Sequence, residues 1–156
     1  MSIKEREEDG NPMEKRSIET IELEMAVLVR RLTSLTTYKK IGNLDRAAYL
    51  LLHQIAFHNG TAGVKALADE FQLDISTVSR QAAALEHKGY ITRVPDPVDG
   101  RAYSLQITET GGEILESNRQ VRHEIIGNLL VHWSDEERAT FGGLLKKFNA
   151  AFQEEG

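Results

Sequence analysis

Two short helical patterns followed by two strand patterns, within residues 61 to 108, limit the possible folds more than any other feature of the sequence. In residues 61 to 89, apolar side chains recur at helical spacing in two runs that a tight break separates. The two runs are Val64, Leu67, Ala68 and Phe71, then Ile75, Val78, Ala82 and Leu85. They predict a helix-turn-helix, in which Asp74 caps the second helix and Gly89 supplies the left-handed residue that ends it.

The sequence after Gly89 alternates in the manner of β-strands. Residues 90 to 94 and 103 to 108 place apolar and polar side chains on opposite faces. The loop PDPVDGRA between them contains two prolines, two aspartates and a glycine, which suit a hairpin turn. A hairpin that directly follows a helix-turn-helix is a wing. We therefore predict a mainly α fold with a small β-hairpin wing, that is, a winged helix-turn-helix domain.

The flanking sequence predicts long amphipathic helices. Between residues 11 and 44 the apolar side chains follow a heptad spacing, which favours packing against another helix. They are Ile18, Ile21, Met25, Leu28, Leu32 and Leu35. Further along, a long helix begins at Thr108 or Thr110, and Ser134 with Glu137 forms the capping box of a last helix. One winged core cannot cover these stripes, so we expect self-association, with folding back inside a monomer as the alternative.

Composition limits the class of protein. The chain has 156 residues, of which 40% are apolar, enough for one compact domain with helical extensions. It contains no cysteine, which excludes a disulfide framework, a zinc–thiolate site and a thiol redox sensor. The longest apolar stretch, Ala47 to Leu52, is far shorter than the ~20 residues of a membrane helix, and the N-terminus is charged. We therefore expect a cytoplasmic protein that does not enter a membrane.

The second helix of the helix-turn-helix carries side chains suited to DNA. If its apolar residues face the core, the outward side chains are Ser76, Thr77, Ser79, Arg80 and Gln81. Arginine can donate two hydrogen bonds to guanine, glutamine can pair with adenine, and short hydroxyls reach phosphate or bases. A merely solvated face is the alternative, but Arg93 and Arg101 at the two ends of the hairpin favour DNA. The net charge of −5 opposes DNA binding mainly at long range, because local cations govern contact.

Several spaced elements occur together between Val64 and Gly111. They are the pair Leu67-Ala68, the Ser/Thr-rich helix from Ile75 to His87, the set Leu85, Gly89 and Ile91, the wing residues Asp96, Asp99 and Arg101, and the set Leu105, Ile107, Thr108 and Gly111. This combination resembles the MarR family of winged helix-turn-helix transcription regulators. One position departs from the family pattern, because Gly100 stands where a basic residue is common.

The resemblance implies a homodimer that binds double-stranded DNA at a near-palindromic operator, with two recognition helices about one DNA turn, ~34 Å, apart. It implies that Asp99 braces Arg101 by a charge-assisted bond while Arg101 reaches toward the minor groove, a surface ion pair being the alternative. It also implies a repressor that responds to a small phenolic or other amphipathic effector. Tyr38, His53 and Phe57 are the candidate lining residues.

These patterns divide the chain into four parts. Residues 1–10 mix charges of both signs and predict a disordered tail. Residues 11–44 form an N-terminal dimerisation helix, residues 45–108 the winged helix-turn-helix DNA-binding domain, and residues 109–156 the C-terminal dimerisation helices. Asn11 is the expected cap of the first helix, with Pro12 at its first position.

Other function classes receive little support from the sequence. His53 and His58, like His123 and His132, lack the spacing that places two imidazoles on one helical face, so we expect no metal site. No nucleophile motif, phosphate-binding loop or dinucleotide fingerprint is present, so we expect neither enzyme activity nor a cofactor. The main alternative to a DNA-binding regulator is a winged-helix adaptor for a protein partner, which the acidic net charge favours.

Overall fold

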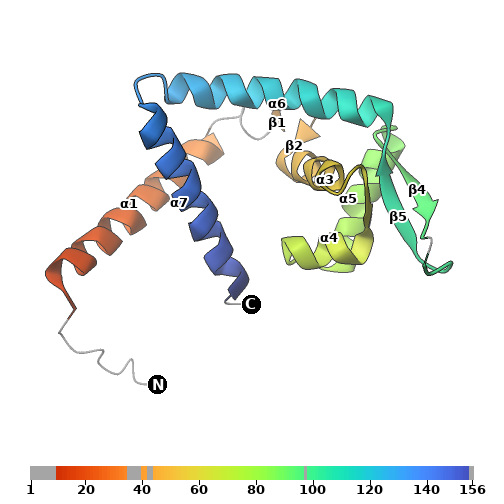
Figure 1. Ribbon diagram of the computed structural model, residues 1–156, viewed down its shortest axis with the longest axis horizontal. Coiled ribbons are helices and arrows are strands. Elements are labelled where there is room, and N and C mark those ends of the chain that lie inside the picture. Colours follow the sequence, from red (N-terminus) through yellow and green to blue (C-terminus); the bar gives the residue numbers. More distant parts are fainter. Residues whose placement is uncertain (1–9, 35–39, 42–43, 97, 155–156) are drawn as a thin grey trace. The chain divides into compact units, whose positions relative to one another are not determined.

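Helices make up most of the computed structural model (Figure 1), which describes residues 10–34, 40–41, 44–96 and 98–154. The elements in chain order are α1 (Pro12–Ser34), β1 (Lys40–Ile41), β2 (Leu44–Asp45), α3 (Arg46–Phe57), β3 (Thr61–Gly63), α4 (Val64–Phe71), α5 (Ile75–His87), β4 (Ile91–Pro95), β5 (Tyr103–Ile107), α6 (Glu109–Leu129) and α7 (Asp135–Glu154). The chain divides into two compact units between Lys40 and Ile41. The predicted fold class, a mainly helical winged helix-turn-helix with long flanking helices, is confirmed.

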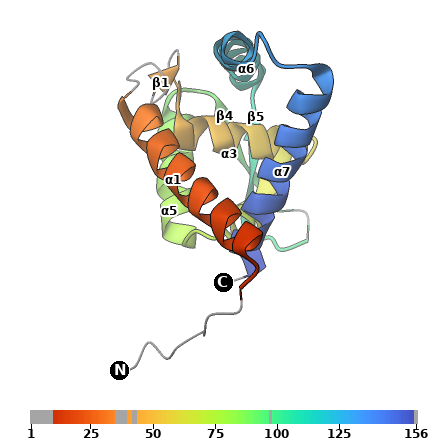
Figure 2. The same cartoon turned by 90° about the vertical axis from the view of Figure 1, so that its left-hand side faces the viewer.

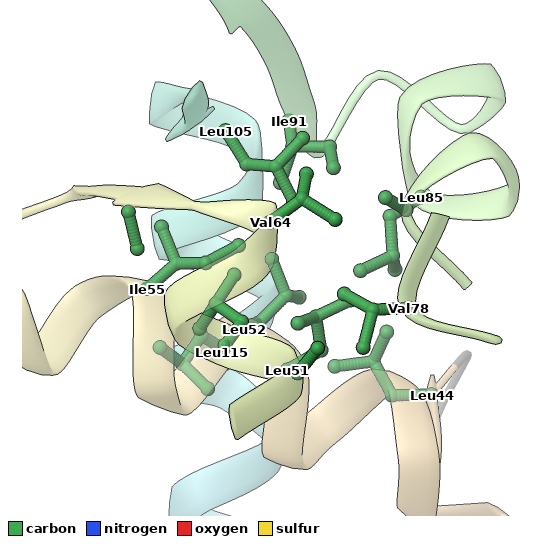
Figure 3. Packing of buried hydrophobic residues seen from close by; sticks show 14 residues of the cluster. Leu44, Leu51, Leu52, Ile55, Val64, Val78, Leu85, Ile91, Leu105 and Leu115 are labelled. Atoms are coloured by element: carbon green, nitrogen blue, oxygen red, sulfur yellow. The ribbon is translucent and has the colours of Figure 1, made fainter. Parts of the chain in front are cut away.

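The core of the second unit lies where the helix-turn-helix, α3, the strands and the first half of α6 meet (Figure 3). Its buried apolar side chains are Leu44, Leu51, Leu52, Ile55, Ala62, Val64, Leu67, Ala68, Val78, Ala82, Leu85, Ile91, Leu105 and Leu115. Each large side chain removed from water contributes about 1.5–3 kcal/mol. Ile75 was predicted to join this core, but it is 53% exposed. It is the first residue of α5 and precedes the turn that packs inward at Val78.

The sheet has three antiparallel strands in the order β3-β5-β4. Strands β4 and β5 form the predicted hairpin, with Ile91 opposite Ile107 and Pro95 opposite Tyr103. Strand β3 was not predicted, because the sequence analysis assigned residues 61 to 89 to the two helices alone. It pairs with the far edge of β5 after a turn in which Asn59 and Gly60 both adopt positive φ angles, 60° and 91°.

Two junctions fix the second helix of the helix-turn-helix against its neighbours. The preceding turn passes through Gln72, whose φ of 53° is left-handed. Asp74 lies at the N-cap position as predicted, but its side chain makes no capping hydrogen bond. Its carbonyl oxygen instead accepts hydrogen bonds from the N–H groups of Thr77 and Val78. At the other end Gly89 has the predicted positive φ, 78°, and the chain turns directly into β4.

Hydrogen bonds of Thr108 join the start of α6 to the residues that precede the wing. The Thr108 hydroxyl donates to the carbonyl oxygen of Gly89 at 2.7 Å and accepts from the N–H of Gly111 at 3.0 Å. A Cβ atom at Gly111 would lie 2.1 Å from the carbonyl oxygen of Tyr90. Only glycine therefore permits this approach of helix to strand.

The two terminal helices have predicted caps but no buried side chain. Asn11 accepts a hydrogen bond from the N–H of Met13, and α1 begins at Pro12 as expected. The helix is shorter than the predicted residues 11–44, because it ends at Ser34 and residues 40–41 are a strand. None of its residues is buried. The sequence predictions for residues 1–9 and for Leu35 and Tyr38 lie outside the described residues.

Helix α7 leaves the carboxyl end of α6 through a short turn, which Figure 2 shows with α6 nearly end-on. Ser134 and Glu137 form the predicted capping box through two reciprocal bonds of 3.0 and 3.1 Å. The bonds from Ser134 lower the pKa of the Glu137 carboxyl. Every residue of α7 from 135 to 153 is exposed, including the apolar stripe Phe141, Leu144, Leu145, Phe148 and Phe152.

Candidate nucleic-acid interface

The outer face of α5 is open and carries the side chains that the sequence predicted there. Val78, Ala82 and Leu85 point into the core. Ser76 and Arg80 are exposed on the opposite side, and Thr77, Ser79 and Gln81 lie half-buried beside them. The first turn of the helix contains no acidic residue. A negatively charged ligand therefore meets no carboxylate on the first turn of this helix.

The Arg80 side chain makes a hydrogen bond within its own helix, but no carboxylate among the described residues neutralises its charge. One of its terminal nitrogens donates to the Thr77 hydroxyl at 3.2 Å, one helical turn earlier. Among the described residues no ion pair involves this guanidinium. Its other N–H groups can therefore donate to a ligand, and a guanidinium offers them in the planar fork that suits guanine or phosphate.

The tip of the wing is ordered by two aspartates. The Asp96 carboxylate accepts hydrogen bonds from the N–H groups of Val98 and Asp99, at 2.8 and 3.1 Å. These bonds lower the pKa of Asp96. The Asp99 carboxylate accepts from the main-chain N–H of Arg101 at 3.0 Å. The resemblance suggested that Asp99 braces the Arg101 side chain, whereas the contact found here is with its backbone.

Arg93 lies at the root of the wing rather than at its tip. Its Nε atom is 3.3 Å from a carboxylate oxygen of Glu86, near the end of α5. Its guanidinium carbon lies 4.6 Å from the centre of the Tyr103 ring on the neighbouring strand. The sequence indicated Arg93 but not its contacts with Glu86 and Tyr103, because no local spacing links the three residues.

A cavity of about 690 Å³ lies between α3, α6 and the start of α7. Tyr49, Arg119, Arg122, His123 and Arg138 are among the residues that line it. The predicted ligand residues do not meet here, because, of those that the structure describes, neither His53 nor Phe57 lines this cavity. Phe57 is 73% exposed at the end of α3. His53 packs beside Tyr49, and burial together with the charge of Arg119 lowers its pKa.

Arg122 is the residue of this cavity that the sequence analysis missed. Its guanidinium lies 4.0 Å from the centre of the Tyr49 ring. Its Nε and one terminal nitrogen are buried without a hydrogen-bond partner among the described residues. One turn earlier, the 98%-buried Asn118 leaves its amide oxygen without a partner as well. Unpaired buried polar atoms are costly, and of these two residues only Arg122 lines the cavity.

Two features of the described residues bear on other classes of function. They contain no group of three or more histidine, cysteine, aspartate or glutamate side chains arranged to hold a metal ion. His58 instead contacts Glu70 at 2.7 Å, and Gln54 donates to the same carboxylate. Among the described residues, no helix is long and apolar enough to cross a membrane.

The winged core and its flanking helices match known regulators. The profile of the MarR family matches residues 44–103. An uncharacterized HTH-type transcriptional regulator of Bacillus subtilis, YxaD, is 46% identical over 136 residues, which cover 86% of this chain and 94% of the relative. The chain belongs to the MarR family. It is thus a DNA-binding transcription regulator of the winged helix-turn-helix type.

Two solved structures of regulatory proteins share the fold. A MarR family protein from Bacillus stearothermophilus aligns with a TM-score of 0.66 at 21% identity, covering 91% of this chain and 97% of that one. An organohalide-sensing transcriptional regulator in its 2,4-dichlorophenol-bound form aligns with a TM-score of 0.69 at 16% identity, covering 97% of this chain and 90% of that one. The fold of this chain is therefore shared along most of its length.

Proposed function

We propose that this MarR-family protein is a ligand-responsive repressor that binds a near-palindromic operator in double-stranded DNA as a homodimer. The observation that carries the DNA-binding role is the exposed, acid-free first turn of α5, with Arg80 displayed beside Ser76, Thr77, Ser79 and Gln81. An α-helix of this kind fits the major groove, where arginine and glutamine distinguish base pairs.

The wing supplies the second set of contacts. Arg101 follows a loop that the carboxylates of Asp96 and Asp99 hold through main-chain bonds, so the loop can present its side chain with little loss of entropy. We assign Arg101 to the minor groove or the flanking phosphates. Asp99 acts on Arg101 through the backbone and does not itself contact the negatively charged DNA.

The homodimer rests on the uncovered apolar stripes of the terminal helices. Helix α1 has no buried residue, and α7 exposes a stripe of phenylalanine and leucine. Monomeric proteins rarely expose apolar surface of this extent. A second copy of the chain, related by a twofold axis, would cover equivalent stripes on both subunits and set two recognition helices about one DNA turn, ~34 Å, apart.

The ligand response is assigned to the cavity beside Tyr49 and Arg122. A ligand there would contact α3 of the winged core and α6 together, so its affinity depends on their spacing and, reciprocally, its binding shifts that spacing. The Arg122 side chain in the lining of the cavity favours a small amphipathic ligand with an acceptor group. The solved relative with bound 2,4-dichlorophenol is a precedent for a small ligand in this fold.

A genome-wide map of bound sites tests the operator, followed by affinity measurements on the recovered duplex. We expect a motif with twofold symmetry and an affinity that falls roughly a thousandfold or more between about 50 and about 200 mM salt. A flat salt dependence, or sites without symmetry, would contradict the proposal.

The acidic net charge of −5 supports one competing function, a winged-helix adaptor that binds a protein through the same face. The two functions differ in the partner recovered with the full chain. Specific DNA with a steep salt dependence favours the regulator, whereas a protein that competes for α5 in the absence of DNA favours the adaptor.

A further inference from the structure

We propose that Glu86 is a positioning residue for DNA binding, acting through Arg93. Together with the Tyr103 ring it holds the guanidinium of Arg93 in place to receive a DNA phosphate. The inference rests on the proposed DNA-binding role of α5 and the wing. It assigns a function to a carboxylate that, by charge alone, opposes that role.

The three side chains come from three different elements. Glu86 is in the last turn of α5, Arg93 is in the middle of β4, and Tyr103 begins β5. Arg93 is directly opposite Leu105, a core residue, so its side chain projects on the face of the hairpin that packs toward the helices. The guanidinium therefore lies where the end of α5 meets the hairpin of β4 and β5.

Two contacts fix this guanidinium and leave part of it open. Its Nε atom pairs with a Glu86 oxygen at 3.3 Å, and its central carbon lies over the Tyr103 ring, 4.6 Å from the ring centre. The described residues give its two terminal nitrogens no further hydrogen bond. Both side chains of the ion pair remain partly exposed, 38% for Arg93 and 41% for Glu86. The side chain is thus partly open to solvent, and its terminal nitrogens keep donors for a phosphate.

The contribution of such an arrangement is orientation rather than stability. An exposed ion pair adds little to the stability of a fold. A free arginine, however, loses rotamer freedom when it binds a phosphate, and a side chain that is already held loses less. Paired terminal nitrogens can then bind phosphate in a bidentate manner. Because Glu86 is negative, its direct effect on DNA is repulsive, so positioning and simple electrostatics predict opposite results when it is removed.

The test compares Glu86→Ala with the wild-type chain, alone and in an Arg93→Ala background, on a random-sequence duplex of about 30 base pairs, long enough for two half-sites. Positioning predicts that Glu86→Ala weakens binding by roughly three- to tenfold, the scale of one ordinary hydrogen bond. The slope of log affinity against log salt should fall by up to about one unit, since a phosphate contact is lost. With Arg93 absent, the same substitution should strengthen binding.

Two controls accompany the measurement. Glu113→Ala removes an exposed carboxylate from α6 and reports the purely electrostatic effect. Thermal unfolding of Glu86→Ala should match the wild type, because an exposed side chain contributes little to the fold. Glu86→Gln keeps an acceptor for Arg93 without the charge, and it should restore at least wild-type affinity.

Each outcome decides the inference. Tighter or unchanged binding by Glu86→Ala, or an equal effect with and without Arg93, shows that Glu86 is only a surface charge. A failure of Glu86→Gln to recover affinity also overturns the positioning role. If the wild-type chain binds no duplex at all, the proposed function and this inference fail together, whereas steep salt-dependent binding by the wild type confines a failure to Glu86.

Discussion

The winged core and the terminal helices use similar apolar patterns with opposite results. Leu52, Leu67 and Leu105 of the core are completely buried, whereas α1 has no buried residue and α7 exposes its apolar stripe. The core elements are short and joined by tight turns, so each one meets another within the same unit. The difference teaches that an amphipathic pattern predicts a covered face but does not identify what covers it.

The same contrast separates two kinds of free energy. Burial inside the core stabilises the fold of one chain. Burial of the terminal stripes, if a second copy covers them, stabilises the assembly and depends on protein concentration. Substitutions in the two regions should therefore affect different measurements, and those that follow are arranged from the largest expected effect to the smallest.

Deleting residues 134–156 should have the largest effect. The truncation removes α7 with its apolar stripe, and it takes Phe141 away from Trp133, which together with Leu129 is already exposed. We therefore expect a monomer or an aggregate. Sedimentation velocity measures the outcome. A truncated chain that remains a well-behaved dimer of normal stability would place the interface elsewhere.

A matched pair of leucine substitutions sharpens the comparison between the regions. Leu52→Ala leaves a cavity in the core and should lower the free energy of unfolding by about 2–5 kcal/mol. Leu144→Ala, at a position that is 58% exposed, should leave the unfolding of a single chain nearly unchanged and raise the dissociation constant of the dimer. Denaturation and sedimentation equilibrium measured on both variants distinguish the two effects. Equal loss of chain stability in both variants would remove the distinction.

Arg80→Ala tests whether the rigid core displays a base-reading side chain. If Arg80 meets a guanine edge, the substitution should cost ~1–3 kcal/mol on the operator and relax the preference at one base pair. If Arg80 contacts phosphate, affinity should fall about equally on all duplexes, and the salt slope should shrink by about one unit. Fluorescence anisotropy on specific and random duplexes separates these roles. Unchanged binding to both would exclude Arg80 from the interface.

The wing tip is expected to give the smallest effect, and its sign is informative. Arg101→Ala should weaken DNA binding without altering the fold, because an exposed loop buries little. Asp99→Ala should also weaken it, since the main-chain N–H of Arg101 loses its acceptor, although removal of a negative charge alone would strengthen binding. Titration of both variants with the same duplex measures the two effects. Tighter DNA binding by Asp99→Ala would show that Asp99 acts only as a surface charge and does not order Arg101.

Local features of the sequence were enough for much of the fold and for part of the candidate site. The left-handed Gly89, the capping box of Ser134 and Glu137, and the hairpin of β4 and β5 each depend on residues that are close in the chain. The outward position of Arg80 follows from helical spacing alone. These predictions held because the interactions that decide them span only a few residues.

Other predictions failed where the deciding contact is distant or depends on backbone geometry. Strand β3 exists because Asn59 and Gly60 turn the chain back onto the edge of β5, which no alternation within three residues could reveal. Asp74 occupies a cap position without capping, and Ile75 begins its helix outside the core. At Asp74 and Ile75 the side-chain type permitted the predicted contact, but the path of the backbone did not produce it.

The sequence by itself determined the order of helices and strands, the helix-turn-helix with its wing, and the polar face of the recognition helix. Those properties follow from periodicity, caps and turn residues, which act over short separations along the chain. Only the tertiary structure decided that Glu86 meets Arg93 and that Arg122 lies over Tyr49 beside a cavity. The physical reason is that hydrogen bonds and ring contacts require atoms within a few ångströms. Folding alone brings these residues that close, because the two residues of each pair lie on different elements.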